Sequence, residues 1–334
     1  IASAGSIAYR LTVPGGEVGA SGITAVGVAP DQRRRGVLRR MMTWLLDDAR
    51  AHGEPVAVLW ASEGAIYQRF GFGFGTLQAG FEVDRSRLVF RSPLPPDDRV
   101  RVRLVDPEEA FERMPPVFEA IRSTTPGSLD RTELKWRNHL LADAEWMRGS
   151  DGVKYRAVLE VDGAPRAYAV YRMRGEWDAR GARSTVMVME LVALDPEAEQ
   201  RLWQWIATMD LVATVKLRRG PMPHPMLSWV AEPRRLGLTV SDALWLRLVD
   251  VPAALAGRTY VGEGTLVLEI ADDQIEANAG RWQLTVPPQG PATVTRTTAD
   301  PDLSLGVAAL ACTSLGAQRF AALAAAPRAR EGRP

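Results

Sequence analysis

Five of the eight residues from 33 to 40 are arginines, and Gly36 stands among them. The stretch follows an apolar strand pattern that ends near Ala29 and precedes an amphipathic helix pattern. Backbone N–H groups at the start of a helix lack partners inside it and carry the positive end of the helix dipole. A tight turn through glycine lets the backbone come close to an anion there. The sequence therefore predicts a cradle that holds the diphosphate of a coenzyme.

Three other roles for the arginine run are a solvated face, a nucleotide-triphosphate cradle and a nucleic-acid site. A run of charges is most often a solvated face, and this role stays open. A nucleotide-triphosphate cradle is excluded because neither G-x-x-x-x-G-K-[ST] nor G-x-G-x-x-G occurs here. The 41 basic and 40 acidic residues leave a net charge of +1, so no broad positive field exists to hold nucleic acid. We expect no nucleic-acid partner.

Cysteine and histidine usage argues against a metal centre. Cys312 is the only cysteine, which excludes an intramolecular disulfide and a thiolate cluster and fits a reducing compartment. The three histidines, His52, His139 and His224, are scattered. No apolar run approaches the roughly 20 residues that span a bilayer. We expect a cytoplasmic protein with no metal and no membrane partner.

The elements around the cradle follow from local patterns. Residues 5–13 and 22–29 are predicted strands joined through Pro14-Gly15-Gly16. The apolar spacing of residues 35–51 predicts a helix, and residues 56–61 form a buried strand. Ser62 is placed to cap a short helix that runs to Arg69, with Glu63 in its first turn. The first residues look like the middle of a domain, so we expect an upstream part to be missing.

A second junction of strand and helix lies further along the chain. The Pro-rich segment 92–98 has the composition of a stiff linker. After it, an Asp-Gly turn predicts a hairpin over residues 158–173, and residues 186–194 form a strand that leads into a helix. This helix opens with Asp195, Glu197 and Glu199, which repel a diphosphate. The second half therefore resembles a degenerate copy of the first, a weak internal duplication.

The pattern changes again after residue 241. Strands are predicted over residues 243–251, 265–270 and 282–286, and helices over residues 305–311 and 314–325. Strands followed by helices indicate a small α+β domain. The predicted domains are residues 1–95, 96–238 and 239–334.

The string Val26-Gly27-Val28-Ala29-Pro30 with Arg33-x-x-Gly36-x-Leu38 resembles the acetyl-CoA signature Q/R-x-x-G-x-G/A of the GNAT N-acetyltransferase superfamily. Leu38 departs from the usual Gly or Ala. The segment 61–73 is similar to the enhanced intracellular survival family of actinobacterial acetyltransferases, and segments at 104–106, 229–235 and 244–251 are similar to its later domains. The resemblance implies an α/β (α+β) fold with tandem GNAT-like domains of mixed sheet flanked by helices, the second degenerate. A sterol-carrier-protein-like α+β domain follows.

The resemblance also assigns roles to individual residues. Val26, Gly27 and Val28 correspond to the strand that hydrogen-bonds the pantetheine arm. The diphosphate would be held by the signature's opening residue and by the turn and first helical residues: Arg33, Arg34, Arg35, Gly36, Val37, Leu38 and Arg39. Ser62 and Glu63 match positions beside the coenzyme, and a plain helix-capping role can hold at the same time.

Tyr67 matches the family's general acid. A neutral phenol, with an ordinary pKa of about 10, is available to protonate a leaving thiolate near pH 7. A tyrosine packed between Ile66 and Phe70 in the core is the plainer alternative. In the family the base is thought to be the C-terminal carboxylate, but residues 330–334 do not resemble the family's apolar ending. We assign no base.

These observations give two expected functions. The first is direct transfer of acetyl from acetyl-CoA, the co-substrate, to primary amines, with no covalent intermediate on the protein. The resemblance implies aminoglycosides modified at several positions, protein lysines as further acceptors, and a homo-hexamer. The alternative is a non-enzymatic module that binds acyl-CoA or lipid, although fold alone does not fix function.

Overall fold

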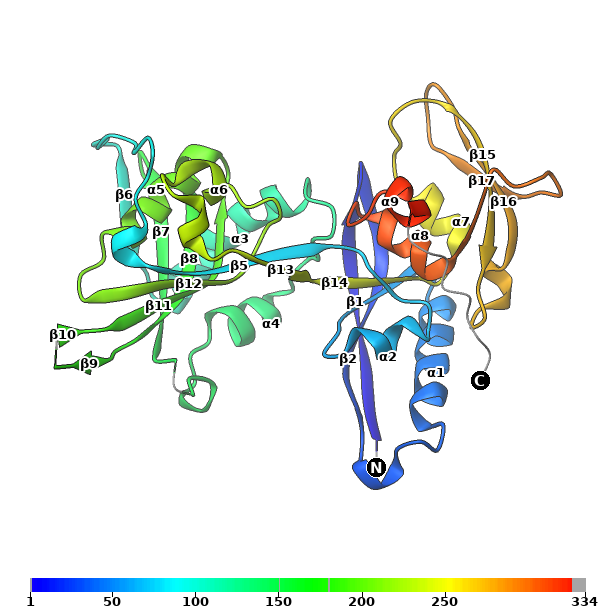
Figure 1. Ribbon diagram of the computed structural model, residues 1–334, viewed down its shortest axis with the longest axis horizontal. Helices are drawn as coiled ribbons and strands as arrows, with labels where there is room; N and C mark the ends of the chain where they lie inside the picture. The colour runs from blue at the N-terminus through cyan, green and yellow to red at the C-terminus, as the bar shows by residue number, and fades with distance from the viewer. Residues whose placement is uncertain (1, 150, 180, 326–334) are drawn as a thin grey trace. The chain divides into compact units, whose positions relative to one another are not determined.

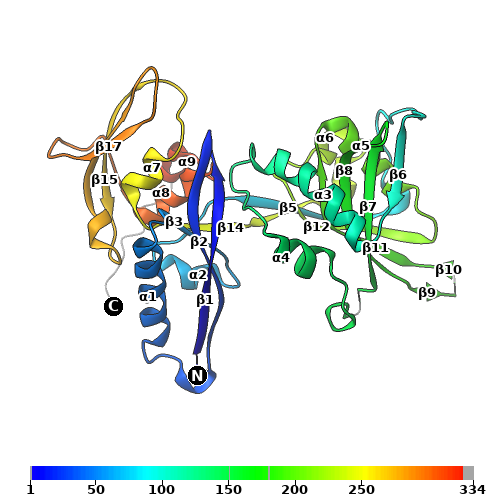
Figure 2. The same cartoon turned by 180° about the vertical axis from the view of Figure 1, so that it is seen from behind.

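The computed structural model describes residues 2–149, 151–179 and 181–325, which form two compact units (Figures 1 and 2). The first unit comprises Ile1–Leu77, Ser123–Asp130 and Asp242–Pro334. The second comprises Gln78–Arg122 and Arg131–Ser241. The second unit is therefore inserted into the sequence of the first. The domain limits at residues 95 and 238 remain a prediction.

The first unit contains a five-stranded mixed sheet in the order β1-β2-β3-β14-β4. β1 and β2 form a hairpin, β2 and β3 are parallel, and β14 runs antiparallel to both of its neighbours. A right-handed crossover through a helix is the usual link between parallel strands. The elements are β1 (Ala2–Val13), β2 (Gly16–Val28), η1 (Pro30–Gln32), α1 (Val37–Ala51), β3 (Val56–Trp60), α2 (Gly64–Gln68), β4 (Gly73–Phe74) and β14 (Leu244–Leu248).

Local sequence explains the β2–α1–β3 part of this sheet. The hairpin turns at Pro14-Gly15, where Gly15 has a φ of +75° that favours glycine. On α1, Met42, Leu45 and Ala49 are buried at helical spacing. Residues 56–59 of β3 are buried on both faces of the sheet, whereas Trp60 is exposed. The predicted hairpin, helix and strand are thus present, with ends shifted by a few residues.

The position of β14 differs from the sequence-based expectation. The sequence predicts a strand over residues 243–251 in the last domain, but β14 lies between β3 and β4 and is followed by helix α7. Its leucines pack in one core cluster, whereas Trp245 packs in another, as the alternation of a strand requires. A strand is therefore present where the pattern predicts one. Its partners lie far away in sequence, so local periodicity could not place it.

The last part of the chain adds a four-stranded sheet in the order β17-β16-β15-β18. Helix α8 packs against β4 and β14. The predicted helix over residues 314–325 is shorter, because the chain first turns at Gly316, where φ is +88°. The elements are α7 (Val251–Ala256), β15 (Gly264–Ala271), η6 (Glu276–Asn278), β16 (Gly280–Val286), β17 (Thr293–Arg296), β18 (Leu303–Gly306), α8 (Val307–Ser314) and α9 (Phe320–Ala325).

The second unit is built on a seven-stranded mixed sheet in the order β13-β5-β12-β11-β8-β7-β6. The predicted Asp162-Gly163 turn joins β7 and β8, with both residues at positive φ. The strands are β5 (Leu77–Asp84), β6 (Val100–Leu104), β7 (Val153–Val161), β8 (Ala164–Arg174), β9 (Trp177–Asp178), β10 (Gly181–Ala182), β11 (Ser184–Ala193), β12 (Val212–Gly220) and β13 (Thr239–Asp242). The helical segments are η2 (Arg85–Arg87), α3 (Pro107–Arg122), α4 (Glu133–Lys135), the π-helix η3 (Trp136–Leu141), η4 (Glu145–Met147), α5 (Pro196–Ala207), α6 (Met226–Trp229) and η5 (Pro233–Leu236).

The segment predicted to be a stiff linker lies within the second unit and is fastened to α5. Arg201 donates to the carbonyl of Pro95 at 3.0 Å, and Gln200 donates to the carbonyl of Ser92 at 2.8 Å. The backbone N–H of Leu94 donates to Gln204. Side chains of one helix thus fix the extended prolines in place.

No helix among the described residues combines the length and apolarity needed to cross a bilayer.

Candidate active site

β2 and β3 pair over only three residues and then diverge. Their parallel pairing ends at Gly22 and Val58, but β2 continues to Val28, hydrogen-bonded to β1 alone. A register shift against β1 falls in this extension, and Ala25 has a φ of +52°. Such a bulge bends its strand. In the described part of the chain, the predicted residues 26–28 therefore have no partner strand on the β3 side.

The turn after β2 leaves the start of α1 open. Arg34 and Gly36 both adopt positive φ, +61° and +73°. Gly36 is the N-cap of α1, and no side chain caps the helix. A methyl group at Gly36 would meet only a guanidinium nitrogen of Arg40, at 3.9 Å, so the conformation rather than crowding selects glycine.

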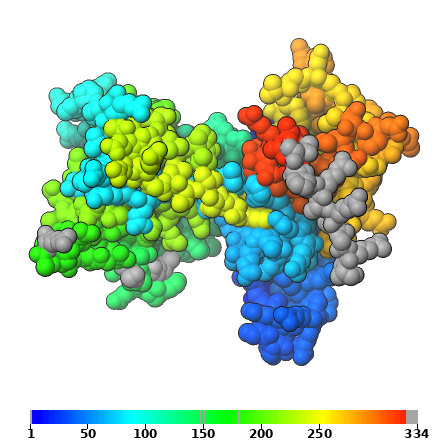
Figure 3. Space-filling view, viewed as in Figure 1, coloured from blue at the N-terminus to red at the C-terminus, as the bar shows by residue number. Residues whose placement is uncertain are grey.

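The amides and arginines of this turn have few partners. Among the described residues, the backbone N–H groups of residues 36–39 donate to no carbonyl or side chain. The arginines at positions 33, 34, 35, 39 and 40 are exposed and form no ion pair within the described ranges. Arg33 makes one long hydrogen bond, 3.5 Å, to the carbonyl of Val28. Figure 3 shows the blue surface around η1 and α1 open to solvent. An anion would meet free donors and uncompensated positive charge here.

Tyr67 lies in α2, in the core cluster that also contains Val26, Leu38 and Met42. Its side chain is 7% exposed and its ring packs edge-on against Phe72, with 6.1 Å between centroids. The hydroxyl has no hydrogen-bond partner among the described residues. Its oxygen is not one of the fully buried polar atoms that lack a partner. Burial raises the pKa of Tyr67. The structure thus brings a protonated phenol into the cluster that underlies the turn.

Ser62 and Glu63 occupy the connection between β3 and α2. Both are exposed. The N-cap of α2 is Glu63 in an extended conformation, and no side chain caps the helix. Ser62 is therefore not the cap that the sequence predicts, and Glu63 precedes the first turn instead of lying in it, because the helix begins one residue later than expected. Their predicted place beside a coenzyme stays a prediction.

Comparison with known proteins decides the family. Residues 1–75 and 127–248 match GNAT acetyltransferase domains, and residues 251–333 match a sterol carrier protein domain. The chain is 37% identical to N-acetyltransferase Eis of Mycobacterium tuberculosis over 96% of its own length and 77% of that protein. It belongs to the Eis family of GNAT N-acetyltransferases. Eis-family membership explains both the two GNAT halves and the last domain.

Another relative and a solved structure support this assignment. An N-acetyltransferase of Streptomyces avermitilis is 40% identical over the whole chain and 81% of its own length. The crystal structure of Eis1 from Mycobacterium abscessus aligns with a TM-score of 0.78 and 34% identity, covering 97% of this chain and 79% of that one. The chain is thus an N-acetyltransferase, and enzymes with GNAT domains take acetyl from acetyl-CoA and give it to an amine.

The second GNAT half repeats the geometry of the first without its chemistry. β11 and β12 are parallel and their pairing ends at Val188 and Leu217, beside a register shift against β8. The following helix, α5, is capped by the Asp195 carboxylate, which accepts from the amide of Ala198 at 2.8 Å and pairs with Arg166 at 2.6 Å. The amide that an anion would use is already occupied by a carboxylate.

The turn after this second junction also matches the turn that carries Tyr67. Residues 67–72 and 233–238 share an arginine, a large apolar residue, a glycine and another large apolar residue, in that order. Gly71 and Gly237 both have positive φ, and each donates its N–H to the carbonyl three residues earlier. Pro233 stands where the first half has Tyr67. The second half therefore lacks both the open cradle and the phenol.

Sequence reasoning missed two residues of β14 that contact the Tyr67 region. A methyl group added at Gly64 would lie 2.6 Å from the Trp245 ring, and one at Gly71 would lie 2.9 Å from the Arg247 guanidinium. The signal was present as an arginine inside the apolar run Leu244-Trp245-Leu246-Arg247-Leu248, because a charge in a buried strand needs a buried partner. That partner is Asp272.

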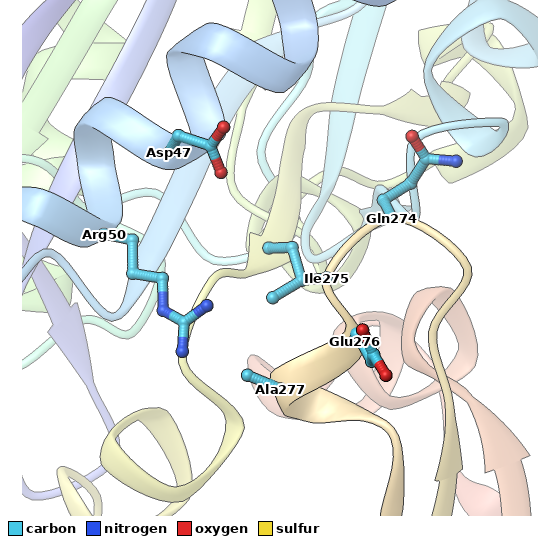
Figure 4. Close-up of a pocket in the computed structure, with 6 residues that line it drawn as sticks. All are labelled: Asp47, Arg50, Gln274, Ile275, Glu276 and Ala277. Carbon is cyan, nitrogen blue, oxygen red and sulfur yellow. The ribbon is translucent and has the colours of Figure 1, made fainter.

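One cavity in the first unit is separate from these residues. It measures about 490 Å³ and lies between the C-terminal half of α1 and residues 274–277 (Figure 4). Asp47 and Arg50 line it from the helix, and Glu276 lines it from the other side. No predicted coenzyme residue lines this cavity, which sits at the other end of α1 from Gly36.

In the described residues, no group of three or more His, Cys, Asp or Glu side chains is arranged to hold a metal ion.

Proposed function

We propose that this Eis-family enzyme holds acetyl-CoA at the divergence of β2 and β3. The diphosphate would bind the amides and arginines of residues 33–39, and the pantetheine arm would pair with residues 26–28 as an added strand. Ser62 and Glu63 would lie beside the coenzyme at the end of β3. The observation that carries this proposal is the uncapped start of α1, with unpartnered amides where β2 loses its neighbour.

Tyr67 is the proposed general acid. The neutral amine nitrogen attacks the thioester carbonyl carbon and passes its proton to water, and a tetrahedral intermediate forms. Its collapse breaks the carbon–sulfur bond, and the leaving coenzyme A thiolate takes the proton of the Tyr67 hydroxyl. The phenolate then takes a proton back from water. Because burial raises the pKa of Tyr67, the phenol stays protonated at neutral pH and well into the alkaline range.

The transfer is proposed to be direct. Cys312, the only cysteine, is buried in α8, and burial raises the pKa of its thiol. A buried thiol with a raised pKa is a poor nucleophile. No acyl-enzyme through this residue is therefore needed or expected.

The acceptors are proposed to be aminoglycosides, modified at several positions, and lysine side chains of proteins or peptides. Support comes from the resemblance to the Eis family, together with the 37% identity to the mycobacterial Eis enzyme. The same resemblance supports a homo-hexamer, which sedimentation velocity would test directly. The lone cysteine and the need for acetyl-CoA favour a cytoplasmic location.

The decisive assay measures release of free coenzyme A from acetyl-CoA in the presence of aminoglycosides, polyamines and lysine peptides. Release that depends on the amine supports the enzyme and ranks its acceptors. Tight binding of acetyl-CoA without amine-dependent release supports the alternative, a non-enzymatic acyl-CoA or lipid-binding module.

Tyr67→Phe tests the assigned acid. Turnover should fall by about 10²- to 10⁴-fold while coenzyme affinity stays nearly unchanged, since only the proton donor is lost. Tyr260→Phe is a matched control, because the Tyr260 hydroxyl donates to the carbonyl of Leu255 at 2.8 Å and has no proposed role. In the wild type, kcat should show no loss up to about pH 10 from ionisation of Tyr67. Normal turnover by Tyr67→Phe would show that another group is the acid.

A further inference from the structure

Strand β14 supports α2 at both ends. Trp245 and Arg247 are two residues apart on this strand, so their side chains leave the same face of the sheet. The Trp245 ring lies against Gly64, the first residue of α2, and the Arg247 guanidinium lies against Gly71, just after its end. Both contacts are too close for any side chain larger than hydrogen. The helix that carries Tyr67 therefore packs against two side chains of one strand.

Arg247 is held rigidly from the opposite side. Its side chain is fully buried, and one terminal nitrogen donates to both carboxylate oxygens of Asp272 at 2.7 Å. Asp272 also accepts the backbone N–H groups of Gln274 and Ile275, and Asn278 donates to it at 3.0 Å. The other terminal nitrogen of Arg247 donates to the carbonyl of Leu248. The guanidinium plane therefore has little freedom to move.

Stability alone is a weak explanation for this buried pair. Replacing a buried ion pair with apolar side chains of similar volume is often neutral or stabilising. The Nε of Arg247 also stays without a partner in the described residues, although it is buried. A planar guanidinium held by fixed hydrogen bonds does offer a rigid surface for a neighbouring backbone, which a flexible aliphatic side chain lacks.

The backbone that lies beside this guanidinium is the turn that follows α2 and Tyr67. The carbonyl of Tyr67 accepts the N–H groups of Phe70 at 3.0 Å and Phe72 at 3.3 Å. Gly71 donates to the carbonyl of Gln68 at 2.9 Å, and the fully buried Phe72 packs its ring against that of Tyr67. A shift of Gly71 would thus be transmitted to the Tyr67 ring through one turn of backbone.

We propose that Arg247, held by Asp272, is a positioning residue that fixes the Tyr67 hydroxyl at the reacting thioester. The inference rests on the proposed role of Tyr67 as the acid. The last part of the chain would thereby contribute to catalysis. The Asp272 carboxylate, just after β15, holds the Arg247 guanidinium, and this guanidinium lies beside the turn that follows Tyr67. The second half has no such need, since Pro233 replaces the tyrosine there.

The test removes the pair without leaving a buried charge. Arg247→Met combined with Asp272→Asn should lower kcat by about 10- to 100-fold, because small misplacements of a reacting group have effects of that size. The KM for acetyl-CoA should stay within about twofold, since the cradle at residues 33–39 is untouched. The same pair of changes made in Tyr67→Phe should cause no further loss of kcat.

A matched control separates positioning from general damage. Arg281→Met with Glu269→Gln breaks another arginine–carboxylate pair of the first unit, on β15 and β16, and should leave kcat unchanged. If the Arg247 and Asp272 changes lower kcat equally in both backgrounds, or not at all, the positioning role is overturned. If that double variant does not fold, Arg247→Lys alone is put through the same double-mutant cycle, because it keeps a cation beside Asp272 and removes only the planar guanidinium. Normal turnover by Tyr67→Phe alone would instead refute the proposed acid.

Discussion

The two strand-to-helix junctions of this protein share a strand arrangement but have opposite chemistry. In both, two parallel strands diverge beside a register shift, and a crossover helix begins where the first strand ends. α1 starts at a bare glycine surrounded by arginines, whereas α5 starts at an aspartate that binds its own helix. The fold therefore provides the opening, and a few residues at the helix start decide whether an anion can use it.

The comparison also shows what each junction gains. The Asp195 cap and its pair with Arg166 stabilise α5, while Gly36 leaves α1 without a cap. An N-cap contributes roughly 1 kcal/mol to stability. The first junction gives up this stabilisation and keeps its amides free, as expected of a site that must bind a ligand.

The largest effect is expected from Gly36→Asp, which gives the first junction the character of the second. A carboxylate and a strained backbone at a φ of +73° should weaken coenzyme A binding by at least about 100-fold, measured by titration calorimetry. Gly53→Asp is the matched control, because Gly53 follows the other end of α1 with a φ of +69° and nothing within 4 Å. Equal coenzyme A affinity of the two variants would show that the start of α1 is not the site that distinguishes the two junctions.

A smaller effect is expected from the double change Arg34→Gln and Arg35→Gln. Loss of two exposed charges beside the diphosphate should weaken coenzyme A binding by about 10-fold and flatten its dependence on salt. Arg218→Gln with Arg219→Gln removes two adjacent exposed arginines from β12 and should change neither quantity. An unchanged salt dependence in the first variant would show that these arginines form only a solvated face.

Asp195→Ala addresses the second junction. It should lower the free energy of unfolding by about 1 kcal/mol, measured by urea denaturation, because α5 loses its cap. Coenzyme A affinity should not change. Glu197→Ala, in the first turn of the same helix, serves as the control for simple loss of a negative charge near the helix dipole. A loss of coenzyme A affinity in Asp195→Ala would mean that the second junction takes part in binding.

The smallest effect is expected on the free energy of unfolding at acid pH. Burial opposes ionisation of Asp195, but hydrogen bonds from the Ala198 amide and from Arg166 outweigh it, so the pKa of Asp195 is lowered. A lowered pKa means that this stabilisation is full above the unfolded value of about 3.9 and is lost as the pH falls through the folded value. The stability difference between wild type and Asp195→Asn should thus be constant from about pH 7 to 5 and shrink below about pH 4. A difference that stays constant at low pH would contradict this.

The parts that sequence predicted well are those set by neighbouring residues. The Pro14-Gly15 hairpin, the apolar stripe of α1 and the Asp162-Gly163 turn all follow from local patterns, and each is present. The signature around Gly36 likewise carried the family, because its residues are consecutive. Its role in binding stays a prediction.

The parts that sequence missed depend on distant residues. The strand containing Arg247 was predicted, but its place between β3 and β4 follows from pairing across the chain. The contact between Arg247 and Gly71 could not be inferred for the same reason. The capping role predicted for Ser62 is wrong because α2 begins one residue later, with Glu63 as its N-cap, and local sequence places a helix end only to within a residue or two.

The place of β14 affects how the nascent protein folds. A ribosome that has completed β4, at Phe74, must still produce the entire second unit before Leu244 emerges. At typical rates of synthesis this delay is on the order of ten seconds, during which β3 and β4 lack the strand that joins them. Unpaired strand edges favour aggregation. Translation speed and chaperones that shield those edges should therefore govern the yield of active enzyme, and any fragment that stops before residue 244 should be insoluble.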